Sequence, residues 1–275
     1  MVLSIINKIS DFNPRILNYI VDYLFVWSYE DNDNNFRDNY NKYKYLKAMP
    51  KPGTTTILGQ GFRKNKAIKY VIIDSSVTRI GIGSFEYATN IKIIVIPSSV
   101  KIIEKLAFSD ILRLKQIYIG KNVEHIKDKA IRYCIELKSI KLPEKLKSIG
   151  EYCFESNTDL EYIEIPCQIE EINEYLLYRC HKLKEIKIPN SVKKIGKGAF
   201  SSCSDLKSII IPDSVKICES IFYNCNSLNY IHIPDSIEKL DPWCFSGCEN
   251  IINITLPKKF KGVLKFIEEE KMTFI

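Results

Sequence analysis

The sequence lacks most of the features that mark membrane, secreted and redox proteins. No apolar run approaches the roughly eighteen residues that a membrane-spanning helix needs. The amino terminus has no basic start, long apolar stretch or small-residue cleavage site, so we expect a cytoplasmic chain. The nine cysteines form no Cys-x-x-Cys pair, which favours free thiols in a reducing compartment.

A strong charge of one sign is also missing. The 40 basic and 33 acidic residues leave a formal net charge of +7 and are interspersed along the chain. There is no polybasic tail, and this mild excess does not indicate nucleic-acid binding. We therefore expect neither a nucleic acid nor a membrane as partner.

What the sequence does contain is a repeat. An aliphatic residue followed by proline recurs every 23 residues or a multiple of it, except for one step of 22 from Pro212 to Pro234. The recurring dipeptides are Ile96-Pro97, Leu142-Pro143, Ile165-Pro166, Ile188-Pro189, Ile211-Pro212, Ile233-Pro234 and Leu256-Pro257. A fixed period of this length predicts a solenoid, here of about nine turns within residues 49–257.

The repeat positions indicate what each turn does. An alternating Ile-x-Ile pair precedes the proline, as in Ile163-Glu164-Ile165, which predicts a strand with its aliphatic residues inward. Proline cannot donate to the strand ladder and therefore ends the strand. Aliphatic residues also recur three and six residues after the proline, and phenylalanine recurs eleven after it. Gly81, Gly150 and Gly196 stand seven after it, which predicts a tight corner with positive φ.

The run Ile188–Ile209 reads Ile-Pro-Asn-Ser-Val-Lys-Lys-Ile-Gly-Lys-Gly-Ala-Phe-Ser-Ser-Cys-Ser-Asp-Leu-Lys-Ser-Ile. This pattern resembles the BspA-type leucine-rich repeat. The resemblance implies a leucine-rich-repeat superhelix that is β-rich, with short helical or irregular connections. It also implies a role in protein recognition, such as adhesion or host interaction.

Five cysteines share one repeat phase, three residues after the phenylalanine position. They are Cys134, Cys180, Cys203, Cys225 and Cys248. Ala88 and Ile111 occupy the same phase in other turns, which predicts a small buried slot filled by free thiols. A metal site and disulfides between adjacent turns are the alternatives.

Outward strand positions supply two candidate partner-binding clusters. The first is apolar, at the amino-terminal end: Tyr70, Ile72, Ile93, Val95 and Tyr118. Such a patch predicts a cover, either the chain's own amino-terminal segment or a partner protein. The second is central and mixes charge with an aromatic ring: Lys141, Tyr162, Glu164, Glu185 and Lys187. This composition suits an interface centre, and also an ordinary solvated surface.

A row of lysines stands one residue before the first outward strand position. It comprises Lys69, Lys92, Lys115, Lys138, Lys184 and Lys207, and Glu161 interrupts it. The row either keeps the surface soluble or offers positive charge to an anionic partner.

Residues 1–48 do not follow the repeat. Asn13-Pro14 can begin a helix, and Phe36–Leu46 is a second helical candidate, so we expect a small α-helical cap. Residues 258–275 are expected to cap the other end. The first helix resembles the opening helix of an F-box, which implies docking to a ubiquitin-ligase scaffold. The residues that carry this resemblance are Pro14, Ile16, Leu17, Ile20 and Leu24.

No catalytic site can be assembled from the sequence. His125, His181 and His232 fall in different repeat phases and should not converge. We expect a monomeric, non-catalytic scaffold without cofactor or metal, which binds a protein through its outward strand surface. The alternatives are a ubiquitin-ligase substrate receptor of the F-box type and a surface adhesion protein.

Overall fold

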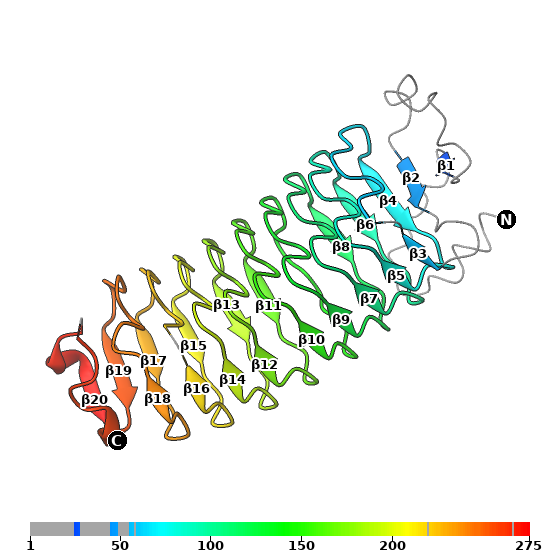
Figure 1. The fold of residues 1–275 in the computed structure, drawn as a ribbon. Helices are drawn as coiled ribbons and strands as arrows, with labels where there is room; N and C mark the ends of the chain where they lie inside the picture. The colour runs from blue at the N-terminus through cyan, green and yellow to red at the C-terminus, as the bar shows by residue number, and fades with distance from the viewer. Residues whose placement is uncertain (1–24, 28–44, 49–54, 58, 219, 266) are drawn as a thin grey trace.

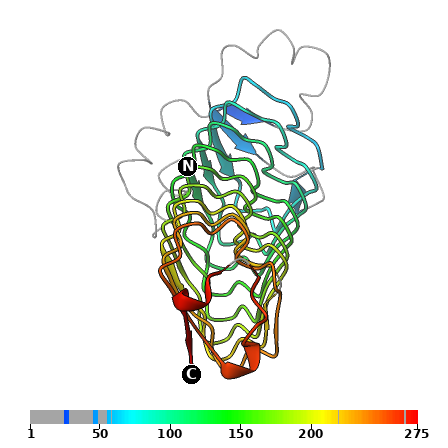
Figure 2. The ribbon, with the colours of Figure 1, turned by 90° about the vertical axis from the view of Figure 1, so that its left-hand side faces the viewer.

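The computed structural model describes residues 25–27, 45–48, 55–57, 59–218, 220–265 and 267–275. The chain winds into an elongated stack of coils, and its strands form two rows along the stack (Figure 1). Figure 2, turned by 90°, shows the coils one behind another. Every strand pair is parallel, because each strand meets its counterpart one coil further on.

The long-strand row holds strands of three or four residues that end just before the proline position. These are β4 (Tyr70–Ile73), β6 (Ile93–Val95), β8 (Gln116–Tyr118), β11 (Tyr162–Glu164), β13 (Glu185–Lys187), β15 (Ser208–Ile210), β17 (Tyr230–His232) and β19 (Asn253–Leu256). They are the strands that the Ile-x-Ile pattern predicts. The alternation is confirmed in β11, where Ile163 is fully buried between exposed Tyr162 and Glu164.

The short-strand row holds two-residue strands that begin five residues after the proline. These are β3 (Thr56–Ile57), β5 (Arg79–Ile80), β7 (Ile102–Ile103), β9 (His125–Ile126), β10 (Ser148–Ile149), β12 (Glu171–Ile172), β14 (Lys194–Ile195), β16 (Ile217–Cys218) and β18 (Lys239–Leu240). The sequence predicted their buried aliphatic residues but not the strands, because two residues are too short for an alternation to be visible.

Irregular turn segments close each coil, and the described residues contain no α-helix. Their backbone amides still form a ladder from coil to coil; for example, the Phe85 N–H donates to the Ala107 carbonyl at 2.8 Å. Phe62, Phe85 and Phe108 stack inside this ladder, with ring centroids 4.9 and 5.5 Å apart. The short helical connections implied by the family resemblance are therefore turns here.

The glycines share one phase of the repeat for a different reason from the one predicted. Gly81 does not have a positive φ, whereas Gly83 and Tyr87 do, at 58° and 60°. A Cβ on Gly81 would lie 2.5 Å from the Ile57 carbonyl oxygen of the preceding coil. The prediction of a positive-φ corner at this phase is wrong, and the glycine instead permits close approach of two backbones.

The five in-phase cysteines form the predicted buried ladder. Each thiol donates to a backbone carbonyl of the coil before it; the Cys180 Sγ lies 3.2 Å from the Phe154 oxygen and the Cys248 Sγ 3.0 Å from the Phe222 oxygen. Burial raises the pKa of both thiols to about 12. Asn157 fills the same phase and donates its side-chain amide in the same way, 2.9 Å from the Ile131 oxygen. The slot is structural, as the sequence indicated.

Both ends of the stack extend the long-strand row. At the amino-terminal end, β1 (Phe25–Trp27) pairs with β2 (Tyr45–Ala48), which pairs with β4. The predicted helix over Phe36–Leu46 is therefore wrong at its last two residues, and its other residues, like the first predicted helix, lie outside the described ones. At the other end, the 3-10 turns η2 (Lys258–Phe260) and η3 (Glu269–Lys271) lead into β20 (Met272–Phe274), which pairs with β19.

Candidate functional site

The apolar cluster at the amino-terminal end is less accessible than predicted. Val95 is only 6% exposed, although its repeat phase is one of the outward positions. It lies in register between Ile72 and Tyr118, whose larger side chains flank it. Ile72, Ile93, Tyr70 and Tyr118 are half-buried. The amino-terminal segment predicted to cover this cluster falls mostly outside the described residues.

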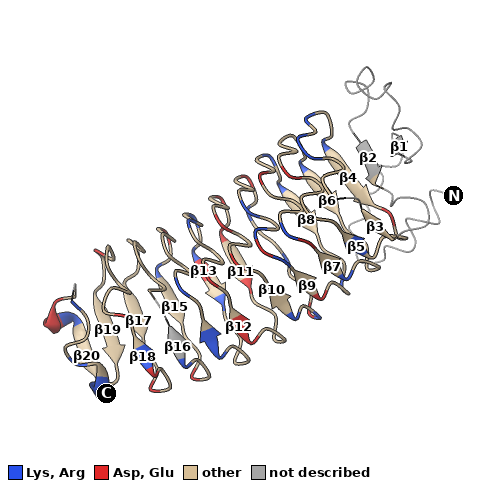
Figure 3. Ribbon diagram, viewed as in Figure 1, with Lys and Arg blue, Asp and Glu red and all other residues tan. Residues whose placement is uncertain are grey.

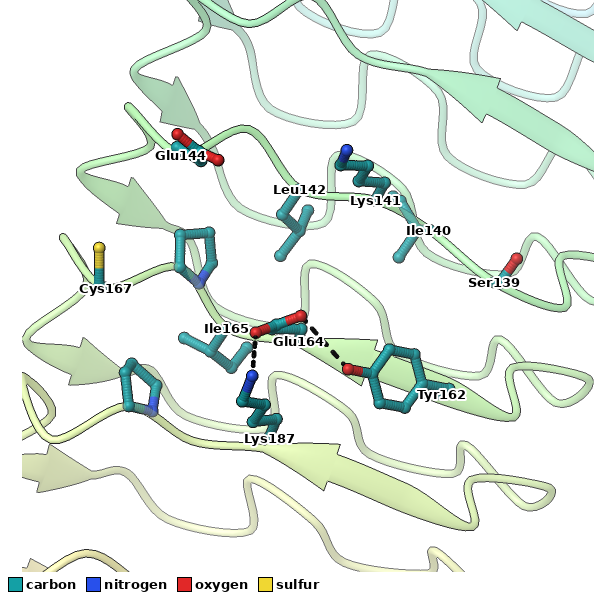
Figure 4. A pocket seen from close by; sticks show the side chains of 12 residues that line it. Ser139, Ile140, Lys141, Leu142, Glu144, Tyr162, Glu164, Ile165, Cys167 and Lys187 are labelled. Carbon is teal, nitrogen blue, oxygen red and sulfur yellow. Dashed lines mark hydrogen bonds and ion pairs between the residues drawn. The ribbon is translucent and has the colours of Figure 1, made fainter. Parts of the chain in front are cut away.

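The central cluster surrounds one groove. Lys141, Tyr162, Glu164 and Lys187 line a groove of about 680 Å³ at the outer surface of the long-strand row (Figure 4). Glu144 and Cys167 line it near the proline corners. Glu185, the fifth predicted member, is exposed on β13 in register with Tyr162 but does not line the groove.

The groove lies at the first of two interruptions of the long-strand row; the second falls between β13 and β15. Sheet pairing stops after β8 and resumes at β11, and between them only Ser139 forms an isolated bridge to Tyr162. Among the described residues, no backbone hydrogen bond joins residues 140–142 to the coil on either side. A second groove of about 570 Å³ lies toward β8 and shares Lys141, Leu142 and Glu144 with the first.

In the short-strand row, strand pairing is interrupted one coil further along the chain. The hydrogen bonds between turn segments continue there. Pairing stops between β10 and β12, where the Asn173 side-chain amide donates to the Ile149 oxygen at 2.6 Å. In the turn segment of the same coils, the Phe154 N–H still donates to the Leu176 oxygen at 3.0 Å. The turn side therefore stays hydrogen-bonded in the coils where strand pairing stops in both rows.

Charge in the central cluster is organised around Glu164. Its carboxylate accepts from the Lys187 ammonium at 2.7 Å and from the Tyr162 hydroxyl at 3.3 Å (Figure 4). The hydrogen bond and charge of Lys187 lower the pKa of Glu164. Desolvation and the Glu164 charge raise the pKa of Tyr162, which remains a neutral donor.

Large apolar side chains stand exposed further along the same row. Ile210 on β15 is 84% exposed, and Tyr230 on the neighbouring β17 is 54% exposed. Ile252, just before β19, is exposed as well. The sequence placed Ile210 and Tyr230 outward but did not single them out, because their apolar character became informative only once the coil register was known.

The short-strand row presents a different surface. Its outward charges pair from one coil to the next: Lys193 with Glu170 at 3.2 Å, Lys194 with Glu171 at 2.6 Å, and Lys147 with Glu124 at 2.6 Å. Figure 3 shows adjacent acidic and basic segments on β12 and β14. This surface is largely neutralised by its own residues.

The three histidines lie in separate coils. His125 and His181 each contact a serine of the next coil, Ser148 at 2.8 Å and Ser204 at 3.2 Å. Within this part of the chain, no three His, Cys, Asp or Glu side chains are arranged to hold a metal ion. No helix among these residues is long and apolar enough to cross a membrane.

The F-box-like run lies outside the described residues. Pro14, Ile16, Leu17, Ile20 and Leu24 all fall within residues 1–24. The predicted docking to a ubiquitin-ligase scaffold therefore stays a prediction.

The family follows from the repeat itself. Residues 55–184 and 170–269 match the BspA type Leucine rich repeat region. The chain belongs to the BspA-type leucine-rich-repeat family. No curated protein matches it.

Several solved structures are similar to this chain. A leucine-rich repeat protein from Bacteroides ovatus is 22% identical, with a TM-score of 0.45 over 81% of this chain and 88% of its own. A leucine rich cell surface protein from Faecalibacterium prausnitzii is 21% identical, with a TM-score of 0.47 over 85% and 80%. The T. pallidum Leucine Rich Repeat protein is 22% identical, with a TM-score of 0.41 over 75% and 76%. The family assignment rests on the repeat match alone.

Proposed function

We propose that this chain is a non-catalytic scaffold that binds a partner protein through the outer surface of the long-strand row. The observation that carries the proposal is the contrast between the two rows. Ile210 and Tyr230 stand exposed on the long-strand row, one and two coils beyond the last coil of the central groove. Exposed aromatic and aliphatic side chains near a groove are typical of interaction surfaces.

Membership of a leucine-rich-repeat family supports the same proposal, since stacked coils expose a continuous surface that can contact a macromolecule. The cytoplasmic location predicted from the sequence remains a prediction. One of the similar solved structures is of a cell surface protein.

The test compares what variants of the full chain retain from a cell lysate. Ile210→Asp/Tyr230→Asp alters the long-strand row, and Lys193→Gln/Lys194→Gln alters the short-strand row as a matched control; both pairs are exposed. Proteins that the wild type and the control retain, but the first variant loses, support the proposal. Equal losses in both variants, or a loss confined to the control, would contradict it.

A further inference from the structure

Several lysines on the outer surface pair with a glutamate one coil away. Lys184 pairs with Glu161 at 2.8 Å and Lys187 with Glu164 at 2.7 Å, in each case across 23 residues. The same spacing joins Lys193 to Glu170 on the short-strand row. Such pairs neutralise part of the surface charge; among the described residues, Lys92 and Lys207, at the phase of Lys184, form none.

Two lysines of the coil at the groove differ in this respect from Lys184 and Lys187. Lys138 and Lys141 occupy the same phases as Lys184 and Lys187, so Glu161 and Glu164 lie one coil beyond them as well. Both glutamates pair instead with the lysines on their far side. Within the described part of the chain, neither Lys138 nor Lys141 makes an ion pair, and both are exposed.

The rest of the groove adds to this positive charge. Lys121 and Lys145 line the second groove with Lys141, and the Lys145 ammonium contacts only the neutral Asn122 side chain, at 3.2 Å. Glu144 is the single acidic residue there. Lys121, Lys141 and Lys145 thus line the two grooves against Glu144, and the paired Lys187 and Glu164 add no net charge. Lys138 is exposed next to Ser139, which lines the first groove. A ligand that complements this excess of lysines carries negative charge.

The groove also offers contacts that a simple anion would not use. Its walls include the apolar side chains of Leu142 and Ile165 beside Pro166. Within the described part of the chain, residues 140–142 belong to no strand, and the isolated bridge from Ser139 to Tyr162 is the pairing beside them. Unpaired strand backbone is a template for an extended peptide, which supplies matching N–H and C=O groups.

We propose that the central groove binds an extended acidic peptide segment of a partner protein, with Lys138 and Lys141 as the main charge contacts. This inference rests on the proposed function and specifies the chemistry of the partner. Lys121 and Lys145 extend the same contact past the proline corner, and the backbone of residues 140–142 pairs with the peptide.

The experiment measures binding of a labelled peptide of about twelve residues, alternating glutamate and valine, by fluorescence anisotropy with the full chain. Lys138→Gln/Lys141→Gln should weaken binding about five- to thirtyfold. The matched control Lys193→Gln/Lys194→Gln removes the same charge from the short-strand row and should change it less than about twofold. A peptide of alternating serine and valine should bind at least as weakly as the acidic peptide binds to the double variant.

Three results would overturn the inference. Equal weakening by both double variants would mean that the chain attracts anions by net charge alone. Equal binding of the serine peptide would remove the role of charge. Binding of a sulfated polysaccharide with the same dependence on Lys138 and Lys141, without binding of the acidic peptide, would assign the groove to another ligand class. If Ile210→Asp/Tyr230→Asp still abolishes protein retention in any of these cases, the proposed function stands and only the inference fails.

Discussion

The two rows of strands are built by the same repeat and yet present different surfaces. Inside the stack they are equivalent, because Ile163 of the long-strand row and Ile172 of the short-strand row are both buried. Outside they differ. The short-strand row pairs Lys193 and Lys194 with glutamates of the preceding coil. The long-strand row has such pairs at Lys184 and Lys187, and it also carries exposed Ile210 and Tyr230.

This difference shows how a repeat protein can vary its surface without changing its core. Inward positions are constrained by every neighbouring coil, so most of those described are apolar. Outward positions contact only two neighbours and solvent, and their side chains are therefore free to serve a partner. Charged side chains that already form ion pairs within the stack are less available to bind a partner.

The largest expected effect separates the inside of the long-strand row from its outside. Ile163→Asp places a carboxylate among fully buried side chains and should destabilise the fold by about 4 kcal/mol or more, unfolding the middle coils. Tyr162→Asp, its 38% exposed neighbour, should change stability by less than about 1 kcal/mol. Thermal melts followed by circular dichroism check both, and similar melting curves would mean that the inward and outward assignment is wrong.

A smaller loss is expected at the corner after the short-strand row. Gly81→Ala sets a methyl group 2.5 Å from the Ile57 carbonyl oxygen, so a backbone must move, at roughly 1–3 kcal/mol. Lys127→Ala, at the same repeat phase on an exposed side chain, is the control and should stay within about 0.5 kcal/mol. Chemical denaturation measures both free energies of unfolding. An unchanged Gly81→Ala variant would argue against close backbone approach as the reason for glycine.

Acid should weaken the ion pairs of both rows. Glu124 accepts from Lys147, and this hydrogen bond and charge lower the Glu124 pKa below 4.5; Lys187 does the same for Glu164. A lowered pKa in the folded state stabilises the fold above pH 4.5, and that contribution is lost as the pH falls through the folded pKa. Melting temperatures measured down to about pH 3 should therefore fall below pH 4.5.

The matched variants for this effect are Lys147→Gln and Lys187→Gln, one from each row. Each variant removes the lysine that is the largest cause of one lowered glutamate pKa. The melting temperature of each variant should therefore fall less between pH 4.5 and about pH 3 than that of the wild type. The two variants should behave alike, because both glutamates are on the surface. If the melting temperatures of both variants fall with pH as much as that of the wild type, these ion pairs do not cause the acid destabilisation.

The smallest expected effect is on the reactivity of the Cys167 thiol, which lines the groove and can show whether the groove is occupied. Cys167 is exposed at the groove, whereas Cys180 is buried with a pKa raised to about 12. Alkylation of the native chain, followed by mass spectrometry, should modify Cys167 well before Cys180. An acidic peptide bound in the groove should slow Cys167 modification, and an unchanged rate at saturating peptide would place the peptide elsewhere.

The sequence predicted the coil architecture because its period constrains every inward position many times over. Ile163, Ile186 and Ile209 recur at one phase, and their burial follows from that recurrence. The same logic identified the cysteine ladder. The period did not predict the short strands, because two residues are too few to show an alternation. It also gave the wrong reason for Gly81, where glycine is required by a close contact with another coil and not by a positive φ.

The candidate site was predictable only in part. The period placed Lys141, Tyr162, Glu164 and Lys187 side by side, and they do surround one groove. No local signal marks the interruption at residues 140–142, because Ile140 and Leu142 fit the repeat and are buried like their counterparts. The repeat phase placed Val95 outward. Its low exposure could not be predicted from the phase, because Ile72 and Tyr118 of the two neighbouring coils flank it.

The most direct test of the central claim is a hydrogen-exchange footprint of the full chain with the protein that it retains most strongly. The account predicts slower exchange along the long-strand row, from Ser139–Leu142 through β11 and β13 to β15 and β17, with unchanged exchange in the short-strand row. Protection confined to the short-strand row or to the turn segments would contradict the assignment of the long-strand row as the binding surface.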